Sequence, residues 1–169
     1  MSVKNEDNKI IPVFIEVSKC SRMKYEWCKK KNCLVLDRVL HSSVVYPYNY
    51  GFMSDTLCGD GDALDVLIYN DNEMIPGCLV MVRPIGFMIM EDEKGMDEKV
   101  LGVIDQDPRY NHINDIEDIP DHNLKEITHF FETYKQLEKE KWVKVDSWKG
   151  KKETLQLIKK TQDNFEKNI

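Results

Sequence analysis

Asp60, Asp62 and Asp65 lie within six residues of one another, and two of them directly follow a glycine. The apolar run 66–69 comes next, so the glycines favour a tight turn and the run favours a buried strand. Carboxylates this close repel one another unless a positive charge lies among them, and hard divalent cations such as Mg²⁺ bind carboxylate oxygens. The stretch indicates a metal-binding turn, with a solvated acidic turn as the alternative.

Two better-known loops do not fit this stretch. An EF-hand counted from Asp60 needs glycine at its sixth position and glutamate at its twelfth, where this chain has Asp65 and Asp71. A dinucleotide-binding fingerprint beginning at Gly59 needs a final glycine where Leu64 stands. Neither a calcium loop of that kind nor a nucleotide-binding turn is expected here.

A second acidic cluster contains Asp92, Glu93 and Asp97 and lies between the apolar runs 85–90 and 100–104. By itself, such a cluster is most simply a solvated hairpin tip. Two acid-rich turns, each joined to an apolar strand, together indicate a shared metal site.

The composition indicates a single domain spanning residues 1–169. A net charge of −6 and a pI near 5.3 argue against nucleic acid or an anionic membrane as a partner. Residues 1–9, a loose lead-in, contain no apolar signal segment, and the longest apolar run, 79–90, is interrupted by Arg83 and Pro84. We therefore expect a cytoplasmic protein.

The cysteines and histidines form no zinc-binding or disulfide pattern. The five cysteines include no Cys-x-x-Cys pair, and the four histidines include no His-Glu-x-x-His pattern. We expect free thiols in a reducing compartment and structural or surface histidines.

The hydrophobic pattern predicts strands along most of the chain and helices near its end. The expected strands are 10–17, 24–27, 34–40, 66–69, 79–90 with a bend at 84–86, 100–104 and 142–148. Spacings of three and four predict one helix that opens near Pro120 and continues to Leu137, and another that ends close to the C-terminus. Five to seven strands with two late helices indicate an α+β barrel with helices packed outside.

Two segments leave alternatives open. The run 34–40 is apolar on both faces and should be buried, so the charges of Asp37 and Arg38 within it need partners. Either the two residues form a structural ion pair, or Arg38 faces a ligand. The stretch 44–53 is rich in tyrosine, which fills a core or supplies the wall of a pocket.

From about Val13 to Trp148, an ordered set of motifs resembles the soluble family I inorganic pyrophosphatases in their bacterial form. The matching segments are Ile15-Glu16, Lys24-Tyr25-Glu26, Asp37-Arg38, Tyr46-Pro47-x-Asn49-Tyr50-Gly51, Asp60-Gly61-Asp62-x-x-Asp65-Val66, Asp92-Glu93-x-Gly95-x-Asp97-x-Lys99, His129-Phe130-Phe131-Glu132-x-Tyr134-Lys135 and Lys141-Trp142-Val143-Lys144-Val145. Each motif alone is modest, but the ordered set is specific.

The resemblance implies an α+β fold: a five-stranded, OB-like closed β-barrel with flanking strands and two C-terminal α-helices. It also implies a hydrolase of phosphate metabolism that cleaves pyrophosphate to two phosphates, using several Mg²⁺ ions per active site, with Mn²⁺ or Zn²⁺ as possible substitutes. The metal-binding residues implied by the family pattern are Asp60, Asp65, Asp97, Asp92, Glu16, Glu26 and Glu93.

The same pattern assigns the catalytic and substrate-binding residues. Asp62 corresponds to the general base that acts on water. The residues expected to contact phosphate are Lys24, Arg38, Tyr50, Lys99, Tyr134 and Lys135, of which the first three are also expected to be catalytic. Tyr46 and Lys141 are expected to line the cavity.

The chain departs from the family pattern at two places. Ala63 stands where the acidic signature usually has proline, which loosens the turn without removing a ligand. Thr133 stands where bacterial relatives often carry a second histidine, on a helix that joins trimers into hexamers. We still expect a homohexamer, although not one that depends on that histidine.

Two other functions compete with this one. A barrel that binds single-stranded nucleic acid could stack bases on Tyr46, Tyr48 and Tyr50, but the acidic pI and nearby carboxylates oppose it. A calcium-binding or purely structural protein explains the acids and leaves Arg38, Lys99 and Lys135 without a role. The enzyme accounts for both the acidic and the basic residues.

Overall fold

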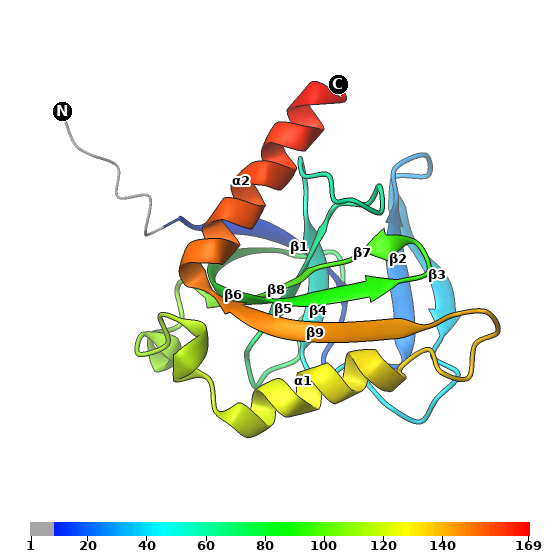
Figure 1. Ribbon diagram of the computed structural model, residues 1–169, viewed down its shortest axis with the longest axis horizontal. Coiled ribbons are helices and arrows are strands. Elements are labelled where there is room, and N and C mark those ends of the chain that lie inside the picture. Colours follow the sequence, from blue (N-terminus) through cyan, green and yellow to red (C-terminus); the bar gives the residue numbers. More distant parts are fainter. Residues whose placement is uncertain (1–8) are drawn as a thin grey trace.

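The computed structural model describes residues 9–169, which form nine strands and two α-helices (Figure 1). The strands are β1 (Ile11–Val17), β2 (Met23–Cys28), β3 (Cys33–Val39), β4 (Asn49–Met53), β5 (Leu64–Ile68), β6 (Leu79–Asp92), β7 (Gly95–Met96), β8 (Lys99–Ile104) and β9 (Val143–Gly150). The helices are α1 (Asp121–Thr133) and α2 (Lys151–Lys167), and two short 3-10 helices, η2 (Pro108–Tyr110) and η3 (Ile116–Asp118), precede α1. Apart from Lys9, the lead-in expected at 1–9 lies outside the described residues.

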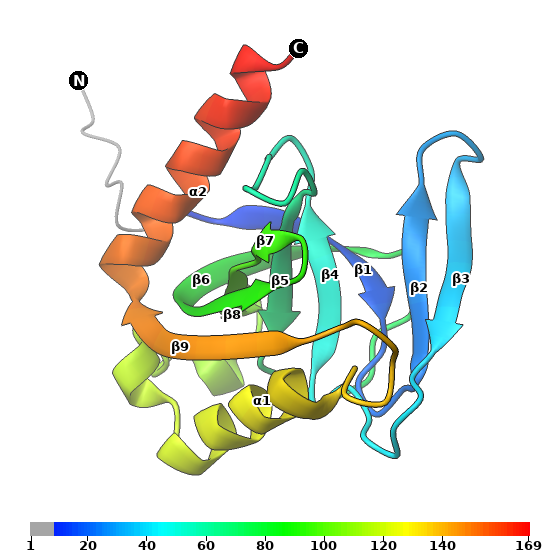
Figure 2. The ribbon, with the colours of Figure 1, turned by 45° about the vertical axis from the view of Figure 1, so that its right-hand side comes forward.

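Five strands close into a ring of hydrogen bonds. β1 pairs with β4 and β6, β4 with β5, β5 with β8, and β8 with β6; only the β5–β8 pair in this ring is parallel. β7 and β9 pair with β6, and β2–β3 forms a separate hairpin beside the barrel, on the side away from α2 (Figure 2). The predicted α+β barrel with flanking strands and two C-terminal helices is confirmed.

The long strand β6 joins the barrel to its outer layer. Its register against β8 shifts between Pro84 and Gly86, at the bend that the sequence predicts. Proline has no N–H to donate to a ladder, so a shift of this kind is where a central strand tolerates it. The bend lets one strand pair with β1 and β8 in the ring and with β9 outside it.

Two hydrophobic clusters hold the described residues together. The first fills the barrel, where Ile11, Val13 and Ile15 of β1 are fully buried together with Ile158 of α2. The second lies beneath α1 and contains the tyrosines of the stretch 44–53. No helix within residues 9–169 is long and apolar enough to cross a membrane.

The tyrosines of this stretch are core residues. Tyr46 is 1% exposed, and its ring centroid lies 4.7 Å from that of Phe130 and 5.1 Å from that of Tyr50. Tyr48 and Tyr50 are 6% and 5% exposed. Rings buried in this way offer no platform on which a base could stack, so the nucleic-acid hypothesis loses its main support.

Two expectations from the sequence are wrong. β3 was expected to be buried on both faces, yet Leu36 and Val39 are 44% and 45% exposed, because the β2–β3 hairpin stands beside the barrel instead of within it. The first helix was expected to reach Leu137, but α1 ends at Thr133 and Leu137 is 69% exposed.

Candidate active site

A cavity of about 410 Å³ opens between the β2–β3 hairpin, the two acidic turns and the segment that follows α1. Its lining is dominated by charged side chains of both signs. The charged residues and tyrosines that line it are Glu16, Lys24, Glu26, Lys29, Asp37, Arg38, Tyr50, Asp60, Asp62, Asp65, Asp92, Glu93, Lys94, Asp97, Lys99, Tyr134, Lys135 and Lys141. Every residue for which the sequence predicts a catalytic, substrate-binding or metal-binding role therefore faces this one space.

The parallel pairing of β5 with β8 brings the two acidic turns together. It places Asp65, at the start of β5, in register with Lys99, at the start of β8. The Lys99 ammonium donates hydrogen bonds to Asp65 Oδ2 at 2.6 Å, to Asp97 Oδ1 at 2.8 Å and to the Tyr50 hydroxyl at 3.2 Å. One buried cation thus joins a carboxylate from each turn.

Lys99 remains charged although its side chain is only 3% exposed. Burial alone lowers the pKa of a lysine, but the surrounding Asp65, Tyr50 and Asp97 raise the pKa of Lys99 well above its usual value. The rings of Tyr50 and Phe131 also lie under the ammonium, at 5.5 and 5.7 Å from their centroids.

Lys135 makes a second pairing of the same kind. It follows α1, and its ammonium lies 2.8 Å from Asp92 Oδ2 and 3.2 Å from Glu93 Oε2. Burial raises the pKa of Asp92, but its hydrogen bonds with Lys135 and the backbone N–H of Lys94 outweigh burial and lower it. The second acidic turn is therefore held against the end of α1 by charge.

The hairpin supplies the opposite wall of the cavity. Lys24 Nζ of β2 lies 2.6 Å from Glu26 Oε1, and Arg38 Nη1 of β3 lies 2.6 Å from Asp37 Oδ2. Arg38 Nε also lies 3.0 Å from Glu138 Oε1. The ion pair expected between Asp37 and Arg38 is therefore present, and Arg38 also lines the cavity.

The first acidic turn places its aspartates at different depths. Gly61 has a φ of +89°, which side chains rarely allow, and the Asp62 N–H donates to Asp60 Oδ1 at 3.0 Å. Burial, together with Asp97, raises the pKa of Asp60. The Asp62 side chain is 67% exposed and lies 3.8 Å from Lys94 Nζ, at the mouth of the cavity.

Glu16 reaches the cavity from β1. Its Oε1 accepts a hydrogen bond from the Trp27 N–H at 2.7 Å, which ties β1 to the hairpin. Burial is the main reason that its pKa is raised to about 7, and the nearby carboxylates of Asp65 and Glu26 add to the shift.

The donor set of the cavity fits a hard divalent cation, since carboxylate oxygens are the protein ligands that Mg²⁺ prefers. Within residues 9–169, no group of three or more His, Cys, Asp or Glu side chains is arranged so that it could hold a metal ion. Instead, Lys99 lies between a carboxylate of each turn, Asp65 and Asp97, and Lys135 pairs with two carboxylates of the second turn, Asp92 and Glu93. Binding a cation therefore requires these ammonium groups to give up some of their contacts.

The structure also shows where the sequence prediction was incomplete. Tyr46 was expected to line the cavity, but it is buried in the core against Tyr50. Glu138 was not anticipated: it is 9% exposed, pairs with Arg38 and lies 3.5 Å from Lys141 Nζ. Glutamates are common in the segment 132–140, and nothing in the pattern distinguishes this one.

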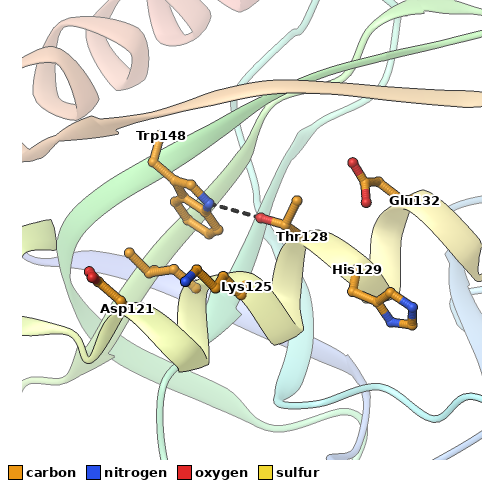
Figure 3. A pocket seen from close by; sticks show the side chains of 7 residues that line it. Asp121, Lys125, Thr128, His129, Glu132 and Trp148 are labelled. Atoms are coloured by element: carbon orange, nitrogen blue, oxygen red, sulfur yellow. Dashed lines mark hydrogen bonds between the residues drawn. The ribbon is translucent and has the colours of Figure 1, made fainter.

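A second pocket, also of about 410 Å³, lies along α1 and β9. We call it the α1 groove. It is lined by Asp121, Leu124, Lys125, Thr128, His129, Glu132 and Trp148 (Figure 3). The Trp148 indole N–H donates to Thr128 Oγ1 at 3.1 Å, as the dashed line in the figure marks.

Comparison with known proteins shows to which family this site belongs. A family model described as inorganic pyrophosphatase matches residues 13–166, which include every residue assigned to the cavity. The chain belongs to the inorganic pyrophosphatase family. The inorganic pyrophosphatase of Saccharolobus solfataricus is 45% identical over 152 residues, 89% of this chain and 88% of that protein. The inorganic pyrophosphatase of Thermus thermophilus is 46% identical over 152 residues, 89% of this chain and 87% of that protein.

The fold agrees with this membership. The crystal structure of the Thermus thermophilus inorganic pyrophosphatase superposes with a TM-score of 0.91 and 42% sequence identity, covering 98% of this chain and 95% of that one. The family I pyrophosphatases are metal-dependent enzymes that hydrolyse inorganic pyrophosphate, and this chain is an enzyme of that class.

Proposed function

We propose that the charged cavity is where this chain hydrolyses inorganic pyrophosphate to two phosphates, with Mg²⁺ as the preferred cation. The observation that carries the proposal is the position of Lys99 Nζ, 2.6 Å from Asp65 and 2.8 Å from Asp97, because it shows both acidic turns opening on the same space. Opposite them stand Lys24 and Arg38 of the hairpin. A site lined by both carboxylates and cations suits a phosphate ester or anhydride that arrives with metal ions.

The basic side chains and tyrosines bind the substrate in this proposal. Arg38 offers a planar fork that can hold two phosphate oxygens at once, and Lys24, Lys99 and Lys135 act as point charges. Tyr50 and Tyr134 donate hydroxyl hydrogen bonds from the floor of the cavity. These contacts orient pyrophosphate and neutralise charge on the departing phosphate, and hydrolysis of an anhydride depends mainly on those two effects.

The carboxylates hold the cations and accept the proton. Asp60, Asp65 and Asp97 are the proposed metal ligands, Asp92 serves further ions, and Glu16, Glu26 and Glu93 support them. Bound Mg²⁺ supplies charge neutralisation and the Lewis acidity that activates water. Asp62, exposed at the mouth of the cavity, takes the proton from the attacking water as general base.

Phosphate release from pyrophosphate, measured with and without Mg²⁺, tests the proposal. We expect hydrolysis with Mg²⁺, little without it, and a loss of about 10³-fold or more in Asp65→Asn. Asp71→Asn is the matched control, because Asp71 is 90% exposed and lies outside the cavity. A clean, Mg²⁺-replete preparation that leaves pyrophosphate intact contradicts the proposed function.

We also propose that the chain assembles as a homohexamer in the cytoplasm. Support comes from the resemblance to the bacterial enzymes and from the five cysteines, all of which are free thiols. Sedimentation equilibrium gives the mass of the assembly directly, and a monomer or dimer at micromolar concentration contradicts this assignment.

A further inference from the structure

Two cysteines lie opposite each other at the tip of the β2–β3 hairpin. Cys28 is the last residue of β2, Cys33 is the first of β3, and the two are direct partners in the antiparallel register. Directly opposite residues in such a ladder have Cα atoms about 4.5 or 5.5 Å apart and side chains on the same face. Both spacings lie within the range of about 4.4–6.8 Å that a disulfide spans.

We propose that Cys28 and Cys33 form a reversible disulfide site that clamps the tip of this hairpin. Both thiols are free, Cys33 is exposed and Cys28 is half-buried, so a dissolved oxidant reaches Cys33 first. The other cysteines have no cross-strand cysteine partner within the paired strands of residues 9–169. Burial also raises the pKa of Cys58 and of Cys78, which disfavours their thiolates.

The oxidant that suits this site is an anionic low-molecular-weight disulfide, of which oxidised glutathione is an example. The loop between the cysteines contains Lys29, Lys30 and Lys31, all exposed, and their charges attract an anion to the tip. Reaction with such a disulfide also needs no metal or cofactor, only thiol exchange.

The reaction is a pair of exchanges. The Cys33 thiolate attacks one sulfur of the oxidant, which releases one thiolate and leaves a mixed disulfide on Cys33. The Cys28 thiolate then attacks the Cys33 sulfur, so that the Cys28–Cys33 bond forms and the second thiolate leaves. The two protons lost by the cysteines end on the two released thiols. The protein is oxidised by two electrons and the oxidant is reduced by two.

The clamp acts on the strand that carries part of the cavity wall. Lys24, Glu26 and Cys28 alternate along β2 and so share one face, and the first two line the cavity. Near the tip, the Trp27 N–H bond to Glu16 anchors β2 to β1, whereas the only strand partner of β3 among the described residues is β2, so β3 can separate there by breaking that one ladder. A covalent bond at the tip suppresses that opening.

Tryptic peptide mapping after incubation with oxidised glutathione tests the bond. Trypsin cuts after the lysines of the loop, so the peptides 25–29 and 32–38 separate unless a disulfide joins them. We expect the joined pair in the wild type and in Cys20→Ser, an exposed-cysteine control, and its disappearance in Cys33→Ser or after dithiothreitol. Glutathione retained on Cys33, with no joined peptides, overturns the proposal.

Hydrogen exchange tests the clamp without any reference to catalysis. In the oxidised wild type, backbone amides of β2 and β3 should exchange about tenfold more slowly than in the reduced protein, while Cys33→Ser shows no change with oxidant. If the bond forms and the exchange rates stay the same, the clamping role is wrong.

Discussion

The charged cavity and the α1 groove have the same volume, about 410 Å³, but they differ in how their charges are held. In the cavity, Lys99 and Lys135 are buried and each bonds to two carboxylates. In the groove, Asp121, Lys125 and Glu132 are exposed, and the one hydrogen bond drawn in Figure 3 is neutral, between Trp148 and Thr128.

We infer that paired burial of charges, rather than volume, distinguishes the proposed active site from the α1 groove. Taking a lysine and two aspartates out of water is costly, and the cost is offset only by the close contacts among them. Exposed charges on a helix contribute little to stability and can be changed freely. Substitutions in the cavity should therefore have large effects, and the same changes in the groove should have small ones.

Lys99→Met should cause the largest loss of stability. It leaves the buried carboxylate of Asp97 and the half-buried carboxylate of Asp65 without their cation, so we expect the free energy of unfolding to fall by about 3–5 kcal/mol. Urea denaturation measures this, with Lys125→Met in the groove as the control, where the change should stay within about 0.5 kcal/mol. Because Mg²⁺ binds the same carboxylates in our proposal, it should restore part of the loss. Equal losses in both variants would remove the distinction between the two pockets.

Glu16→Gln should flatten the pH dependence of stability. Burial raises the pKa of Glu16 from its ordinary value of 4.5 to about 7 in the folded protein. Between these pH values the Glu16 carboxyl is protonated in the folded state and ionised in the unfolded state. The free energy of unfolding of the wild type therefore falls as the pH rises from about 4.5 to 7, by at most about 3 kcal/mol. Glutamine keeps the acceptor for the Trp27 N–H and cannot ionise. Urea midpoints measured across this pH range test the prediction. The measurements are made without divalent cations, and Glu91→Gln, at an exposed glutamate, is the control. If the stability of the wild type and of Glu16→Gln depends on pH in the same way, Glu16 does not have a raised pKa.

Arg38→Lys should weaken substrate binding, with a smaller change in free energy than the changes in stability expected for Lys99→Met and Glu16→Gln. The ammonium keeps the charge but cannot hold two oxygens in the fixed geometry of a guanidinium. We expect KM for pyrophosphate to rise about tenfold, which corresponds to about 1.4 kcal/mol. Arg22→Lys is the matched control, because Arg22 is exposed and donates to the Ser43 carbonyl at 3.2 Å, outside the cavity. An unchanged KM in Arg38→Lys places the substrate elsewhere.

Glu132→Gln should have the smallest effect. Like Asp65→Asn it removes one carboxylate charge from a pocket, but Glu132 lies exposed in the α1 groove. We expect kcat/KM to stay within about twofold of the wild type in the same phosphate-release assay, as for most exposed surface changes. A loss comparable to that in Asp65→Asn would show that the groove takes part in the reaction.

Much of the fold follows from local patterns in the sequence. Alternating apolar residues locate β1, the bend at Pro84 locates the register shift of β6, and Pro120 locates the start of α1. The exposure of β3 could not be predicted, because apolar residues on both faces of a strand do not show which neighbours it meets.

The candidate site was predictable as a set of residues but not as a set of contacts. Acidic turns beside glycines mark Asp60 and Asp65, and the motifs of the family mark the basic residues. The partner of each charge depends on how distant segments pack. Glu138 is 100 residues from Arg38, and nothing in the sequence pairs them.

The parallel pairing of β5 with β8 also determines when the cavity can form. Lys99 meets Asp65 across 34 residues of chain, and the intervening β6 must be in place before the ring closes. Contacts between distant segments form slowly because the entropy of loop closure is lost before they stabilise the chain. During refolding, catalytic activity should therefore return together with closure of the ring, and a growing chain that has not yet reached Lys99 has neither strand β8 nor the cation that joins the two halves of the site.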